Sequence, residues 1–486
     1  MTEETAPSLQ RLATHSLLSH PALAISALDD LPVLLFPSLF MEAYTGGHRE
    51  VLKAMVQAWP FPCLPLGALA QSPGLETVKA VLDALDLRLA QKEHPSGSKL
   101  LVFNLRKEHP EFWIRGYTSM VQTSYQDNRT EKTTLSCCSG ITEEQALIIA
   151  MDLTIKDGAR NPTQTYLLQW ARERKEQVHL CSRKMKVQSE SISEMQKALL
   201  VVNLDSIQEL ELTKFLGLET MQTLAPYLSG MKNLHILKIS MKGTSWHTFS
   251  PKWEAYLEPL KHLQELHVQD AIFCPENLSS ILRSLPPLKA LSLSHCVMME
   301  SHLWFLSCCP YTRQLKHLRL RHLFMDDISP EPLRALLEHV ASNLETLALE
   351  CCHITDSELS FILPTLSQCS QLRFFSFYGN RISMAALQNL LSHTARLGHL
   401  RRGLYPAPVE SYCPQTWWDE SIDPDRFALI QTGLTQPLRG MKTKQKVQIC
   451  THFSHLKNKC QFYSLEPDGS WVVTKEELPS LSALPV

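Results

Sequence analysis

A short string with apolar residues at its first, fourth and sixth positions recurs through the middle of the chain. One copy reads Leu288-Lys-Ala-Leu-Ser-Leu. Successive copies start 25 to 29 residues apart (for example 288 − 263 and 344 − 315). A steady period near this length with this pattern is the signature of leucine-rich repeats. The copies begin at Ile207, Leu234, Leu263, Leu288, Leu315, Leu344 and Leu372.

Each string predicts a β-strand, because its fourth and sixth residues lie two apart and therefore point to one side. The segments between strands carry helix signals. Thr355 and Glu358 form a capping box, and Pro330 occupies a first helical turn. Strand plus helix in each repeat predicts the α/β class: a leucine-rich-repeat horseshoe with parallel strands on the concave side and helices on the convex side. A further, degenerate strand is expected to begin at Val178.

A cysteine or asparagine follows eight residues after the first position in three of the repeats. These residues are Cys296, Cys352 and Asn380. In such repeats this site satisfies backbone groups where the strand turns away, so we favour a structural role over a redox or metal site. The 14 cysteines show no disulfide framework, which indicates reduced thiols and a cytoplasmic or nuclear protein.

The outward positions of the strands are the predicted target-binding surface. Arg and Tyr are favoured contact residues at protein interfaces. The alternative interpretation is a row of solvated strand residues, with Arg321 simply facing Glu350 on the next strand. The predicted target-binding residues are Glu265, His267, His317, Arg319, Arg321, Glu350, Phe374 and Tyr378.

Composition argues against several functional classes. The net charge of −2 and pI of about 6.8 give no whole-protein attraction to nucleic acid or to anionic lipid. No secretory signal and no membrane-spanning apolar stretch are visible. The common catalytic and phosphate-binding motifs are absent, and only 17 residues are glycine. We expect neither an enzyme nor a cofactor.

The N-terminal region is helical by pattern. Pro21 starts a predicted helix in which Leu23, Ala27 and Leu31 recur on one face, and Pro32 ends or kinks it. This helix and the following Leu34-Leu35-Phe36 segment resemble a BC-box and a cullin-box, which dock on Elongin C and then on a cullin. The opening of an F-box, which docks on Skp proteins, has a similar pattern. A packed amphipathic helix pair without a partner is the simpler alternative.

Three Leu-x-x-Leu-Leu strings begin at Leu31, Leu333 and Leu387. Such strings on helices can dock on nuclear receptors. The last two lie on repeat helices, where we expect the same face to be buried against the strands.

Composition and pattern divide the chain into four parts. They are a helical region with the docking-like segment (residues 1–92), a helical and loop-rich flank (93–175), the repeats (176–400) and a C-terminal cap (401–486). Residues 93–99 and 119–134 are expected to be loops. The tail contains Cys450, His452, His455 and Cys460, but this spacing matches no standard zinc finger, so we expect no metal.

Several longer strings resemble the PRAME (preferentially expressed antigen in melanoma) family over nearly the whole chain. They are Ala22-Leu-Ala-Ile-Ser-Ala-Leu28, Trp59-Pro-Phe-Pro-Cys-Leu-Pro-Leu66, Ile354-Thr-Asp-Ser-Glu-Leu359 and Leu404-Tyr-Pro-Ala-Pro-Val-Glu-Ser-Tyr412. One departure is the family's C-terminal Cys-x-x-Cys, since His452-Phe-Ser-His455 stands here instead. This makes a metal role for the tail still less expected.

The resemblance implies a repeat horseshoe without catalytic activity. It implies a substrate receptor of a cullin-RING ubiquitin ligase, assembled through Elongin B and C, that binds protein substrates such as transcription regulators or nuclear receptors. It also implies transcriptional repression in retinoic acid receptor signalling, restraint of differentiation and apoptosis, support of proliferation, and expression in germ cells. The alternative is a ligase-independent scaffold that acts as a corepressor. The scaffold-binding residues would be Leu23, Ala27, Leu31, Pro32, Leu34, Leu35 and Phe36.

Overall fold

The structure is a computed structural model with two compact units. The first unit comprises Met1–Glu211 and Ser229–Leu234, and the second comprises Leu212–Leu228 and His235–Val486. The described residues are 9–69, 74–90, 99–115, 146–156, 161–188, 192–213, 218–241, 253–273, 277–323, 328–413, 422–441, 445–451 and 461–474. The polar segments 93–98 and 119–134 that were expected to loop out lie outside them.

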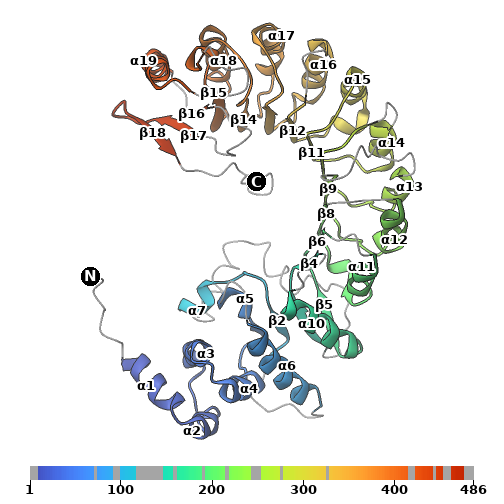
Figure 1. Cartoon of the computed structure of the whole chain (residues 1–486), viewed down its shortest axis with the longest axis vertical. Helices are drawn as coiled ribbons and strands as arrows, with labels where there is room; N and C mark the ends of the chain where they lie inside the picture. Colours follow the sequence, from blue (N-terminus) through green and yellow to red (C-terminus); the bar gives the residue numbers. More distant parts are fainter. Residues whose placement is uncertain are drawn as a thin grey trace. The chain divides into compact units, whose positions relative to one another are not determined.

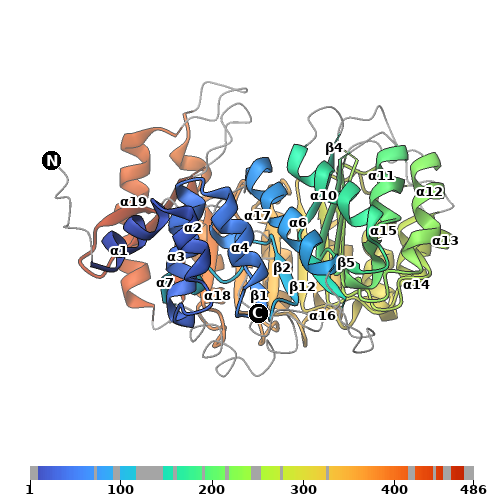
Figure 2. The ribbon, with the colours of Figure 1, turned by 90° about the horizontal axis from the view of Figure 1, so that it is seen from below.

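The second unit is built from alternating strands and helices. Figure 1 shows its parallel strands side by side, with the helices on their outer side. In Figure 2, seen from below, the first three helices of this unit, α12, α13 and α14, lie close together at the right of the view. The parallel strands are β9 (Ile236–Ser240), β10 (Glu265–Gln269), β11 (Ala290–Ser294), β12 (His317–Arg321), β13 (Thr346–Glu350), β14 (Phe374–Ser376), β15 (Arg402–Pro406) and β16 (Lys446–Thr451). The helices are α12 (Leu218–Leu228), α13 (Trp253–Leu257), α14 (Asn277–Ser284), α15 (Glu300–Cys308), α16 (Pro330–Val340), α17 (Asp356–Leu366) and α18 (Met384–Thr394).

The apolar string of each repeat sets the strand that it forms. Strands β9 to β14 each begin two residues after the first apolar position of their string. In β12 the fourth and sixth positions, Leu318 and Leu320, are fully buried against the helices. The capping box at Thr355 opens α17, and Pro330 begins α16. The predicted leucine-rich-repeat fold is therefore confirmed.

The parallel ladder continues beyond residue 400, where the sequence pattern is lost. In β15 the fourth and sixth positions are Gly403 and Tyr405 instead of two leucines. A Cβ atom on Gly403 would lie 2.5 Å from Cε2 of Tyr405, so glycine is required beside this large ring. The hydroxyl group of Tyr405 lies 2.7 Å from that of Thr394, which satisfies it in the core. The ring of Tyr405 thus fills the space of two leucines, and the strand therefore lacks the leucine spacing of the other repeats.

The second unit ends in an antiparallel hairpin next to a long helix. The helix is α19 (Pro424–Gly440), and the hairpin strands are β17 (Gln461–Leu465) and β18 (Trp471–Thr474). The edge of Phe462 in β17 meets the ring of Tyr378, with 6.4 Å between centroids. The hairpin therefore adds to the core beside the last repeats.

The first unit combines helices with a second parallel sheet. Its helices include α1 (Leu9–Leu18), α2 (Pro21–Ser26), the 3-10 helix η1 (Val33–Leu35), α3 (Phe36–Thr45), α4 (Arg49–Gln57), α5 (Leu66–Leu69), α6 (Leu75–Ala90), α7 (Glu111–Arg115), α10 (Pro162–Glu173) and α11 (Ile192–Leu199). The sheet has the order β1 (Cys63–Leu64), β2 (Val102–Asn104), β3 (Leu147–Ala150), β5 (Val178–Cys181) and β7 (Val202–Asn203). The parallel strands β4 (Leu153–Lys156) and β6 (Lys184–Gln188) belong to the longer, 13-stranded sheet, in which β6 lies next to β8 (Glu209–Thr213), the strand of the string that begins at Ile207.

The expectation of a helical region up to residue 175 therefore holds only in part. Strands β1 to β4 were missed because each spans two to four residues, too few for a period to show. A strand does begin at Val178, as expected, but this strand, β5, belongs to the five-stranded sheet and is not a further strand of the repeat ladder.

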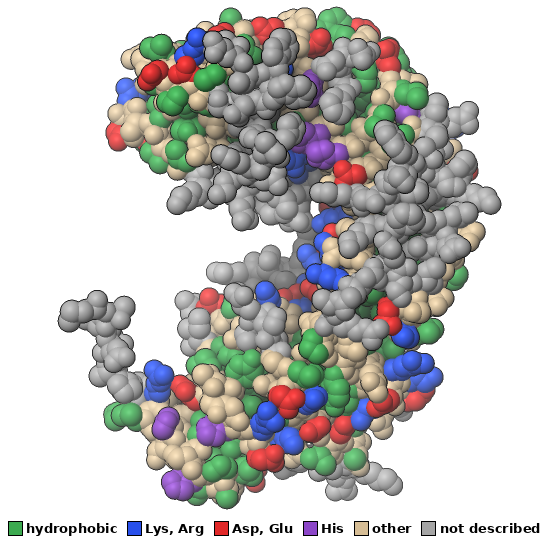
Figure 3. All heavy atoms as spheres, in the orientation of Figure 1, with side chains coloured by type: hydrophobic (Ala, Val, Ile, Leu, Met, Phe, Trp, Pro, Cys, Tyr) green, Lys and Arg blue, Asp and Glu red, His purple; other side chains and the backbone are tan. Residues whose placement is uncertain are grey.

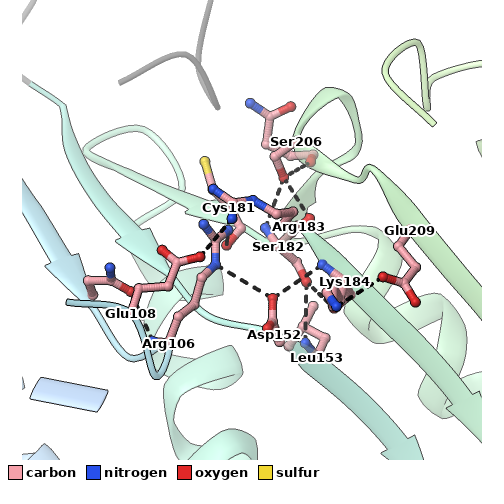
Figure 4. A network of polar contacts seen from close by, with 12 residues as sticks. Arg106, Glu108, Asp152, Leu153, Cys181, Ser182, Arg183, Lys184, Ser206 and Glu209 are labelled. Atoms are coloured by element: carbon pink, nitrogen blue, oxygen red, sulfur yellow. Dashed lines mark hydrogen bonds and ion pairs between the residues drawn. The ribbon is translucent and has the colours of Figure 1, made fainter. Parts of the chain in front are cut away.

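Polar side chains bridge the points where the chain leaves the five-stranded sheet (Figure 4). The hydroxyl group of Ser182 accepts a hydrogen bond from the backbone amide of Leu153 at 3.2 Å. The hydroxyl group of Ser206 accepts one from the backbone amide of Ser182 at 2.9 Å. Arg106 lies buried among them, with its Nε atom 3.5 Å from Asp152. These contacts satisfy backbone groups where the strands break, so they have a structural role.

Candidate functional site

Seven large apolar side chains are exposed among residues 9–35, and we call them the N-terminal apolar surface. Figure 3 shows hydrophobic side chains in green beside the N-terminal end of this region. Leu34 is 72% exposed and Leu23 is 59% exposed. Large apolar side chains that stay exposed close together are typical of interaction sites in soluble proteins. The seven residues are Leu9, Leu12, Leu23, Ile25, Val33, Leu34 and Leu35.

Helix α2 presents Leu23, the first of the predicted docking residues, to solvent. The amide of Ala27 donates to the carbonyl oxygen of Leu23 at 3.0 Å, so the two residues lie one turn apart. Ala24 and Leu28 form the buried face of this segment. The helix itself ends at Ser26, earlier than the spacing of Leu23, Ala27 and Leu31 predicts. The three residues therefore do not share one continuous helical face.

The remaining predicted docking residues follow as a turn and a short 3-10 helix. Leu31 is half-buried, whereas Pro32, Leu34 and Leu35 are exposed. Phe36 differs, because it is only 3% exposed and the edge of its ring packs against Trp59. Phe36 is therefore a core residue that holds the segment in place, and a partner does not reach it in this conformation.

An aromatic cluster under α3 supports this surface. The rings of Phe40 and Trp113 stack with 5.5 Å between centroids, and the edge of Phe40 also meets Trp59. The indole of Trp59 donates to the carbonyl oxygen of Cys63, and that of Trp113 donates to Pro65, each at 3.0 Å. The two indoles thus bind carbonyl groups of the proline-rich connection and tie it to the aromatic cluster. The motif thus builds a rigid base.

Strands β10 and β12 present the accessible part of the predicted target-binding surface. Glu265, His267, His317 and Arg321 are half-buried. An imidazole nitrogen of His267 lies 3.3 Å from the carboxylate of Glu265. Burial lowers the pKa of the His317 imidazole below its ordinary value, which keeps it neutral near pH 7. This face therefore combines acidic, basic and imidazole side chains.

The other predicted target-binding residues are buried, which corrects the expectation that they face a partner. Glu350 is 2% exposed and receives a hydrogen bond from Tyr378 at 3.4 Å. It also lies 3.6 Å from the guanidinium of Arg319 and 3.8 Å from that of Arg321. Phe374 and Tyr378 belong to a core cluster with Phe462. The ion pair of Arg321 with Glu350 on the adjacent strand matches the alternative interpretation.

The residues at the ends of the repeat strands satisfy backbone groups, as predicted. The side-chain amide nitrogen of Asn380 donates to the carbonyl oxygens of Leu349 and Phe377 at 2.7 and 2.8 Å. Its side-chain oxygen accepts hydrogen bonds from the backbone amides of Cys352 and Ile354. Burial raises the pKa of the Cys296 thiol to about 12 and also raises that of Cys352. Protonated, buried thiols are unreactive.

The Leu-x-x-Leu-Leu faces of α16 and α18 are buried, as expected for repeat helices. The string that begins at Leu31 ends instead within the N-terminal apolar surface. The two repeat strings are therefore not available for docking in the folded protein.

The described residues hold no cluster of three or more side chains suited to a metal ion. Cys450 lies buried in β16, whereas His452, His455 and Cys460 are outside the described residues. Within the same described part of the chain, none of the helices has the length and apolar character that a membrane crossing requires.

Comparison with solved structures gives leucine-rich-repeat proteins at low sequence identity. A chain from the yeast Rad7 and Elc1 complex is 16% identical with a TM-score of 0.34, covering 61% of this chain and 73% of that one. An internalin from Listeria monocytogenes is 13% identical with a TM-score of 0.31, covering 66% and 89%.

Comparison with protein families gives matches along most of the chain. The PRAME N-terminal domain matches residues 6–113, and the PRAME C-terminal domain matches residues 147–469. The human PRAME family member 8 is 40% identical over 459 residues, which cover 93% of this chain and 96% of that protein. The human PRAME family member 7 is 39% identical with the same coverage. A leucine-rich-repeat chain with these matches belongs to the PRAME family.

Proposed function

We propose that this protein is the substrate-recognition subunit of a cullin-RING ubiquitin ligase, assembled through Elongin B and C. The N-terminal apolar surface carries the proposal. It contains Leu23, Leu34 and Leu35, which resemble BC-box and cullin-box positions, and all three are exposed. Two independent features, the sequence pattern and the exposure, thus fall on the same residues.

The local structure suits a preformed docking site. Helix α2 packs on α4, and the 3-10 helix η1 leads into α3, whose buried face packs on the aromatic cluster around Trp59. A rigid base keeps the exposed leucines in place before a partner arrives, which lowers the entropy cost of binding. Small Ala27 beside Leu23 allows close approach of a partner helix.

The proposed mechanism is proximity. The second unit binds a protein target, and the docked ligase brings the ubiquitin-charged enzyme to the lysines of that target. The target is then degraded by the proteasome. Loss of a transcription regulator by this route would restrain transcription, differentiation and apoptosis. The chain itself contributes no acid, base or nucleophile to this mechanism.

Co-purification of Elongin B, Elongin C and a cullin with the full chain tests the proposal. The test variant is Leu34→Asp, and the matched control is Leu429→Asp on α19, because both leucines are 72% exposed. Circular dichroism of both variants checks folding. Since both side chains are solvated, each substitution is expected to change the free energy of unfolding by less than about 0.5 kcal/mol.

Retention of the ligase components by the wild type and by Leu429→Asp, with their loss from folded Leu34→Asp, supports the proposal. Failure of the folded wild type to retain any of them contradicts it. That result favours the alternative function, a ligase-independent corepressor scaffold.

A further inference from the structure

The turns that lead from helix to strand in the second unit are rich in basic side chains. Six such turns between Glu258 and Arg401 contain seven Lys or Arg residues and two Glu residues. The whole chain, in contrast, has a net charge of −2. We call the seven the basic rim, and all of them are exposed. They are Lys261, Lys289, Arg313, Lys316, Arg373, Arg396 and Arg401.

Four residues of the basic rim occupy the same register position on neighbouring strands. Each directly precedes its strand, and the backbone hydrogen bonds join them in sequence. The amide of Lys316 donates to Lys289 at 2.8 Å, and that of Arg401 donates to Arg373 at 2.9 Å. Strands lie about 4.8 Å apart, so the row from Lys289 to Arg401 across five strands is about 19 Å long.

Glu345 occupies the same position in this row, and its contacts show that the basic side chains can bind a carboxylate. The carboxylate of Glu345 lies 2.7 Å from Nζ of Lys316 and 3.8 Å from Nε of Arg373. The hydrogen bond from Lys316 lowers the pKa of Glu345 below its ordinary value. A single carboxylate is thus held by two cations, while no ion pair within the described residues involves Lys289, Arg313, Arg396 or Arg401.

The opposite edge of the same sheet has acidic side chains. Helix macrodipoles account for part of this, because acidic residues are favoured in a first helical turn. The macrodipoles also favour basic residues in a last helical turn, but Lys289, Lys316 and Arg373 lie beyond the last turn of any helix, so this effect does not explain them. The acidic residues of the opposite edge include Asp270, Glu300, Glu331, Asp356 and Glu410.

We propose that the basic rim binds an extended acidic segment of a partner protein through its carboxylates. An extended chain advances about 3.3 Å per residue, so about six residues span the row. Nucleic acid fits less well, because single-stranded sites use several large stacking rings, and Tyr311 is the one Tyr, Phe or Trp in these turns. The inference does not depend on docking to the ligase, since it concerns a surface of the second unit and none of the N-terminal docking residues.

Fluorescence anisotropy with the full chain and labelled peptides tests the inference. The probe is a Glu/Ser peptide of about 12 residues, with a Gln/Ser peptide of equal length as its control. We expect the wild type to bind the Glu/Ser probe at about 50 mM salt, with weakening toward about 300 mM because exposed charges are screened. A labelled oligothymidine measures binding to nucleic acid.

Two variants are expected to shift the affinity for the Glu/Ser probe in opposite directions, and a third is the control. Arg373→Gln/Arg401→Gln is expected to weaken binding of the Glu/Ser probe about fivefold, the scale of two exposed ion pairs. Glu345→Gln is expected to strengthen it about twofold, because Lys316 and Arg373 are released. Arg172→Gln/Lys175→Gln removes the same charge from exposed positions in the first unit and is expected to change it by less than about twofold.

Three results would overturn the inference. They are no binding of the Glu/Ser probe by the wild type, equal weakening by both double variants, and tighter binding of oligothymidine through the same residues. None of these bears on ligase docking, which is tested with Leu34→Asp in the first unit.

Discussion

Replacing Asn380 tests whether the strand-end residues hold the repeats together. Its side chain is 3% exposed and makes four hydrogen bonds to backbone groups, at 2.7, 2.8, 3.0 and 3.2 Å. Asn380→Ala leaves four buried backbone groups without this partner. At about 1 kcal/mol for each group, the free energy of unfolding should fall by about 4 kcal/mol.

Asn380→Cys is the matched variant, since two other repeats have cysteine at this site. Asn380 both donates to carbonyl groups and accepts from amides. The thiol of Cys352 donates to the carbonyl oxygen of Leu320 at 3.3 Å, so a cysteine keeps the donor role. We expect a loss about half as large as that of Asn380→Ala, about 2 kcal/mol.

Denaturant unfolding and amide hydrogen exchange measure these effects. The amides of Cys352 and Ile354 should exchange faster in both variants, because each loses its acceptor. The reasoning is refuted if Asn380→Ala lowers stability by less than about 1 kcal/mol while both amides stay protected.

Three further predictions concern burial and charge. Phe36→Ala should destabilise the first unit by about 3 kcal/mol, whereas Leu34→Ala should cost less than about 0.5 kcal/mol in thermal or denaturant unfolding. Glu350→Ala should cost about 3 kcal/mol because it removes the buried carboxylate that faces Arg319 and Arg321, and Glu345→Ala should cost less than about 1 kcal/mol; equal losses would contradict this. The lowered pKa of His317 means that its contribution to stability is present above about pH 6.5, the unfolded value, and is lost as the pH falls below it. His317→Gln should therefore reduce the loss of unfolding free energy between about pH 7.5 and about pH 5, and an unchanged pH dependence would contradict the assignment.

The sequence by itself determined the repeat fold. Leucines at fixed spacing specify which strand positions are buried, and the capping box at Thr355 specifies where a helix begins. Both signals are local, because they depend on residues within one repeat. The strand-end role of Asn380 followed for the same reason. The pattern did not reveal β15, where Gly403 and Tyr405 replace the two leucines by a contact that only packing explains.

The tertiary structure decided which predicted site residues are accessible. Phe36 and Leu34 are both apolar and two residues apart, yet one packs on Trp59 and the other faces solvent. Phe374 and Tyr378 occupy outward strand positions, but Phe462, from a strand far along the chain, joins them in one core cluster. Burial of this kind depends on residues distant in sequence, and alternation along one strand carries no information about them.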